Sequence, residues 1–146
     1  MHRRKLLDHL ADYASRHPQE SATTSRFIDF VADEPRCFER DCWRGHVTGS
    51  AWLMDPDEQA LLLTHHRKLD IWVQLGGHSD GDPDTLAVAC REAEEESGVG
   101  VEVIGADIFD LQSQLTRFVT ACVIRSSISS SNAGVVAKFR RTQASL

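Results

Sequence analysis

A cluster of glutamates near the middle of the chain has the residue types and spacing most able to do chemistry. At 3.6 residues per turn, Glu92, Glu95 and Glu96 fall on one face of a helix, whereas Glu94 points elsewhere. Three carboxylates on one face form a hard-oxygen site suited to Mg²⁺ or Mn²⁺. Arg91 lies four residues before Glu95 and can hold a carboxylate through a forked hydrogen bond. A solvated acidic face is the alternative, because acidic runs on helices commonly face water.

The helix that carries these carboxylates has marked ends. Asp82 can cap its N-terminus, Pro83 suits its first position, and Asp84 places a negative charge near the positive end of the helix dipole. Gly98 suits the left-handed residue that ends a helix. The other face of the helix has small or apolar side chains, which predict that it packs against the domain: Leu86, Cys90, Ala93 and Ser97.

A strand and a pair of glycines precede this helix. Residues 71–75 have the composition of a strand, and Gly76 and Gly77 interrupt the chain directly after it. His78 follows, and its imidazole can contact a phosphate or a metal ion; an exposed loop histidine is an equal alternative. Further upstream, residues 46–54 also predict a strand, which ends at a turn rich in Asp and Pro.

From the glycine pair to the end of the acidic helix, the sequence resembles the signature of the Nudix hydrolase family, G-x5-E-x7-R-E-U-x-E-E-x-G-U, where U is a bulky apolar residue. Ala93 is smaller than the signature prefers, and Pro83 stands where the signature has its first glutamate. The positions that match are Gly77, Arg91, Glu92, Glu95, Glu96, Gly98 and Val99.

The resemblance implies an α/β fold, a Nudix-type α/β/α sandwich with a mixed β-sheet formed by residues 46–146. It implies hydrolysis of a phosphoanhydride bond in a nucleoside diphosphate linked to another group, with Mg²⁺ or Mn²⁺ as cofactor. The expected partner is therefore a small nucleoside diphosphate derivative. A diphosphate isomerase on the same fold is a weaker alternative, because that branch usually lacks the full set of acids.

The resemblance also implies roles for individual residues. Glu92, Glu95 and Glu96 would be the metal ligands, and Glu92 or Glu95 would act as the base. Arg91, counted with Glu92 and Glu95 among the catalytic residues, would orient a glutamate. The expected substrate-binding residues directly precede the helix: Gly76, Gly77 and His78.

Residues 1–45 are predicted to form a helical extension that packs on the domain. Apolar residues recur at spacings of three and four from Leu6 to Ala14, and Pro18 ends this pattern. Residues 21–25 are expected to form a loop before a second helix, whose apolar face includes Phe27 and Phe30.

Composition changes sharply near residue 112. All 22 acidic residues come before that point, and residues 112–146 combine five basic residues with seven serines. An atypical segment with an incomplete sheet or a disordered tail is expected there, or else a reading frame that shifted near residue 112. An exposed sheet edge would favour a homodimer.

The remaining expectations come from the whole chain. Its 146 residues predict a single domain beyond the N-terminal extension, and a net charge of −6 argues against nucleic-acid binding. No apolar run is long enough for a membrane span. Four cysteines without paired spacing favour a reduced, cytoplasmic protein. A weakly active or inactive nucleotide-binding module is the alternative function, because Pro83 replaces an acid and no acid follows Asp110.

Overall fold

The computed structural model describes residues 2–68, 70–114, 116–127 and 139–140. In chain order, its elements are α1 Arg4–Arg16, the 3₁₀ helix η1 Pro18–Glu20, α2 Ser21–Asp33, β1 His46–Met54, β2 Leu61–Leu62, β3 Thr64–His66, β4 Ile71–Val73, β5 Leu75–His78, α3 Thr85–Ser97, β6 Val101–Val103, β7 Asp110–Gln114, β8 Arg117–Ser126 and β9 Phe139–Arg140.

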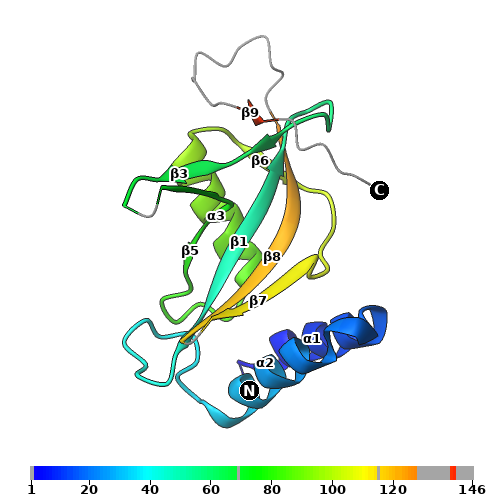
Figure 1. Cartoon of the computed structure of the whole chain (residues 1–146), viewed down its shortest axis with the longest axis vertical. Helices are drawn as coiled ribbons and strands as arrows, with labels where there is room; N and C mark the ends of the chain where they lie inside the picture. The colour runs from blue at the N-terminus through cyan, green and yellow to red at the C-terminus, as the bar shows by residue number, and fades with distance from the viewer. Residues whose placement is uncertain (1, 69, 115, 128–138, 141–146) are drawn as a thin grey trace.

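Two parallel strands form the centre of the sheet. β1 and β8 pair along their length, from His46 with Arg117 to Met54 with Arg125. On the other edge of β1, β5 and β2 follow one another as antiparallel partners, and β7 and β6 do the same along β8. The result is a mixed sheet that curls, with helices packed on it (Figure 1). The expected α/β fold is confirmed.

Helix α3 lies behind the sheet in Figure 1 and packs on β1, β5 and β8. Alternate side chains of β1 point toward it, and Ala51 and Leu53 pack there with Ala89 and Ala93 of the helix. Earlier on the same face, Val47 belongs to a second apolar cluster that includes residues of α1 and α2. The face of the sheet that carries α3 therefore also anchors the N-terminal helices.

The start of α3 differs from the expectation. Asp84 is the N-cap, because its carboxylate accepts a hydrogen bond from the Ala87 N–H at 3.2 Å. Asp82 instead accepts from the Asp84 N–H at 2.9 Å, which forms a turn before the helix and leaves Pro83 outside it. The predicted C-terminus is confirmed: Gly98 has a φ of 73°, which suits a residue without a Cβ.

The N-terminal helices also differ in one detail. The expected loop over residues 21–25 is wrong, because α2 begins at Ser21, directly after η1. Thr24 is buried in that first turn, and its hydroxyl donates to the Glu20 carbonyl at 3.0 Å. A polar-looking segment is thus helical because its threonine faces inward and bonds to its own backbone.

The change in composition at residue 112 does not interrupt the sheet. β7 spans that position, and β8 follows as a central strand with a largely buried pattern. Residues 110–114 and 117–126 are paired in the sheet, on both sides of this change, and the shifted reading frame stays a hypothesis. The predicted disordered tail concerns residues that, apart from 139 and 140, lie outside the described part beyond residue 127.

Two further findings bear on the sequence expectations. Within the described ranges, no helix has the length and apolar character needed to cross a membrane. All four cysteines, which lie in those ranges, have free thiols.

Gly49 provides a test of the packing between β1 and α3. A Cβ at this position would overlap the Thr85 carbonyl oxygen and lie 3.0 Å from the Val88 Cβ. We therefore expect Gly49→Ala to lower the free energy of unfolding by about 1–3 kcal/mol, measured by urea denaturation. Gly105→Ala is the control, since a Cβ on Gly105 would have no described atom within 4 Å. Equal stability of the two variants would contradict this packing.

Candidate functional site

The glycine pair of β5 lies against the acidic face of α3. A Cβ on Gly77 would overlap the carboxylate of Glu92, which would have to move from its present position. The backbone N–H of Gly76 lies close enough to the carboxylate of Glu96, one helical turn further on, to lower its pKa. Two of the three predicted metal ligands therefore meet at the two glycines.

Glu95 and Arg91 do not lie against the two glycines as Glu92 and Glu96 do. Glu95 is exposed, as Glu96 is, but it is not among the atoms that lie against the two glycines. Arg91 lies with its guanidinium 3.5 Å from Glu92 and 3.6 Å from Asp82. Its carboxylate neighbours are therefore Glu92 and an acid of the preceding loop, which sequence spacing alone did not indicate.

Glu96 is an exposed residue overall, yet partial desolvation and nearby charge act on its carboxyl group. Desolvation raises its pKa, the Gly76 N–H lowers it, and the nearby charge of Glu92 raises it again. The net effect is a raised pKa, which means that the charged form of Glu96 is disfavoured without a counter-charge. A cation between Glu92 and Glu96 would supply one.

The carboxylates of Glu92 and Glu96 suit a hard divalent cation, but no third ligand from the described part of the chain is in place beside them. Glu92 and Glu96 provide carboxylate oxygens beside a glycine cradle that a Cβ would fill. Among the described residues, no three His, Cys, Asp or Glu side chains converge closely enough to hold a metal ion. Glu95 would have to turn toward the other two for the predicted three-ligand set to form.

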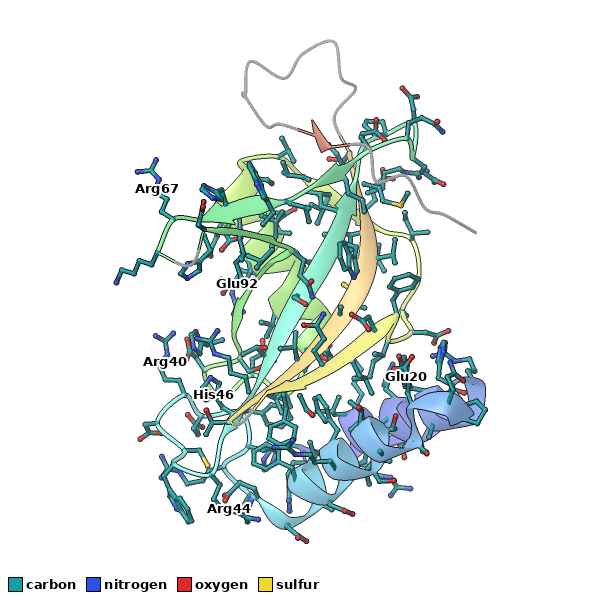
Figure 2. The ribbon with its side chains drawn as sticks, in the orientation of Figure 1. Glu20, Arg40, Arg44, His46, Arg67 and Glu92 are labelled. Atoms are coloured by element: carbon teal, nitrogen blue, oxygen red, sulfur yellow. The ribbon has the colours of Figure 1, made fainter. Side chains whose placement is uncertain are left out.

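His78 belongs to a second group of side chains at the start of β1. Its ring lies 5.0 Å from that of His46, measured between centroids. Arg40 binds Asp80 through Nε, at 2.5 Å, and through Nη2. Figure 2 shows Arg40 and His46 close together, with Glu92 further along the sheet. Sequence reasoning did not single out Arg40, His46 or Asp80 as site residues.

The N-terminal segment holds the loop that leads into α3. The Gly81 N–H donates to the Phe38 carbonyl at 3.0 Å, beside the pair of Arg40 with Asp80. Lys5 binds the capping carboxylate of Asp84 at 2.6 Å and lowers its pKa. Arg40 and Asp80 are 40 positions apart in the sequence, and Lys5 and Asp84 are 79 positions apart. No local sequence pattern could have indicated these contacts.

Neither a protein-family model nor a curated protein matches the chain. Among solved structures, the chain is similar to a crystal structure of a hydrolase of the NUDIX family from Clostridium perfringens. The TM-score is 0.51 at 18% sequence identity, and the match covers 57% of this chain and 69% of that one. This likeness concerns the fold.

The raised pKa of Glu96 predicts how stability depends on pH. A carboxyl group whose pKa is higher in the folded state destabilises that state as pH rises through the folded pKa. In EDTA, Glu96→Gln should therefore gain stability over the wild type as pH increases from about 4 to about 7, measured by urea unfolding.

Glu95→Gln is the matched control for this pH dependence. It removes the same charge from the same end of α3, so it corrects for the interaction of that charge with the helix dipole. A difference between Glu96→Gln and the wild type that stays flat or shrinks with increasing pH would contradict the electrostatic description.

Proposed function

We propose that the chain is a metal-dependent hydrolase that cleaves a phosphoanhydride bond in a nucleoside diphosphate derivative. The observation that carries this proposal is the convergence of Glu92 and Glu96 on the backbone of Gly76 and Gly77. The similarity of fold to a NUDIX family hydrolase supports the same conclusion.

Each residue of the site has a role in this proposal. Glu92 and Glu96, joined by Glu95, would hold Mg²⁺ or Mn²⁺; the bound ion would neutralise the diphosphate and lower the pKa of a water molecule. Arg91 would keep the Glu92 carboxylate in place, and Glu92 or Glu95 would accept the proton of the attacking water. The glycines would let the diphosphate approach the backbone.

A second candidate is a nucleotide-binding module with weak or no turnover. Pro83 occupies the loop position of an acid in the Nudix signature, and it has no carboxylate to offer. Asp110, at the start of β7, is also the last acid of the sequence. Binding without release of product would favour this candidate. Cytoplasmic location, homodimer formation and the absence of nucleic-acid partners stay predictions.

Metal binding tests the proposed function directly. We expect Mn²⁺ titration by calorimetry to show binding that weakens about tenfold or more in Glu92→Gln and Glu96→Gln, since each loses a charged ligand. Hydrolysis of nucleoside diphosphate derivatives should fall in parallel, by about a hundredfold or more. Gly77→Ala should have a similar effect, because its Cβ would displace Glu92.

Glu94→Gln is the matched control. Glu94 lies on the same helix, and its carboxylate accepts a hydrogen bond from the Val101 N–H at 3.1 Å, which an amide oxygen can also accept. This variant should bind Mn²⁺ and turn over substrate like the wild type. If Glu92→Gln, Glu96→Gln and Glu94→Gln all retained full metal affinity, the proposed function would be wrong.

A further inference from the structure

Basic side chains gather where the two central parallel strands begin. His46 of β1 pairs in register with Arg117 of β8, and His78 of β5 pairs with Thr48, two residues along β1. Side chains alternate along a strand, so His46, His78 and Arg117 share the face of the sheet opposite α3. Arg40, from the loop before β1, lies beside His46 at the same end (Figure 2).

In this group, basic side chains outnumber the acidic one, Asp80. The pKa of His46 is lowered first by burial, and then by His78, Arg117 and Arg40, with Asp80 acting in the opposite direction. Arg40 is bound to Asp80 through Nε and Nη2, which leaves its Nη1 nitrogen outside that pair. Asp80 therefore orients the guanidinium while other donors of Arg40 remain able to bind a ligand.

His46 adds an unsatisfied polar atom. Its Nε2 is shielded from solvent and has no hydrogen-bond partner among the described residues. A buried ring nitrogen without a partner is uncommon, and a ligand that enters beside the ring would satisfy it. The ring of His78 lies next to it, so the two imidazoles can act on the same ligand.

The loop around this group is held in one conformation. The Val47 N–H donates to the Cys37 carbonyl at 2.7 Å, and the Gly81 N–H donates to the Phe38 carbonyl at 3.0 Å. The first bond connects the loop before β1 to that strand, and the second connects the loop before α3 to the loop before β1. The basic side chains are thus presented by a fixed backbone, which lowers the entropy cost of binding.

We propose that Arg40, His46, His78 and Arg117 form an anion-binding subsite that takes a phosphoryl group, separate from the metal position at Glu92 and Glu96. The inference rests on the proposed function for its link to substrate: His78 directly follows Gly77, whose backbone lies against the Glu92 carboxylate, so one extended ligand could reach both places. The phosphoryl group is either the free terminal phosphate of a substrate or released inorganic phosphate.

The subsite can be tested without any metal. In EDTA at low salt and about pH 6, inorganic phosphate should bind and shift the side-chain ¹⁵N signals of His46 and His78. Arg40→Gln and Arg117→Gln should each weaken binding about tenfold, and Arg40→Lys should restore part of it. Arg36→Gln is the matched control, since Arg36 forms an exposed pair with Asp41 in the same loop.

Steady-state kinetics with Mg²⁺ then distinguishes the two sources of phosphate. If the substrate supplies it, Arg40→Gln should raise KM about tenfold for a nucleoside diphosphate with a free terminal phosphate, and much less when a neutral sugar esterifies that phosphate. If released phosphate is the ligand, Arg40→Gln should instead weaken product inhibition by phosphate, with equal effects on both substrates.

Two results would overturn the subsite. One is a wild type that binds no phosphate in EDTA up to about 10 mM, and the other is equal affinity in Arg40→Gln, Arg117→Gln and Arg36→Gln. Neither result involves Glu92 or Glu96, so the subsite can fail while the proposed function stands. Conversely, retained phosphate binding with lost metal dependence would overturn the proposed function alone.

Discussion

The close approach of α3 to strands β1 and β5 is the constraint on which the candidate site depends. Two glycines make it possible: Gly49 lets the helix backbone contact β1, and Gly77 leaves room for the Glu92 carboxylate beside β5. A Cβ at either position would overlap atoms of the helix. The carboxylates are therefore held near the β5 backbone by the packing of the helix itself.

This packing has an electrostatic consequence. Glu92 and Glu96 are brought toward each other and partly desolvated, which raises the pKa of Glu96. Such an arrangement is unfavourable for the charged form of Glu96, and the cation of the proposed function would relieve it. Arg91 offsets part of the negative charge by lying near Glu92 and Asp82.

The N-terminal segment contributes to the site as well as to the core. Its apolar residues share a cluster with Val47 and Phe118, and two of its basic residues bind acids of the loop before α3. These ion pairs are exposed, so each adds little stability. Their importance is positional, because they connect the segment to Asp80 and to the helix cap at Asp84.

Local signals in the sequence determined several of the elements. The span of β1, the end of α3 at Gly98 and the face shared by Glu92 and Glu96 follow from strand composition, glycine preference and helical period. The N-cap was misplaced by two residues, because Asp82 and Asp84 are equally good caps and only the turn geometry separates them. Tertiary structure alone decided the rest: which carboxylates reach the glycines, the pairing of Arg40 with Asp80, and the basic group around His46. Those contacts join residues from separate elements, and no local pattern encodes the packing that brings them together.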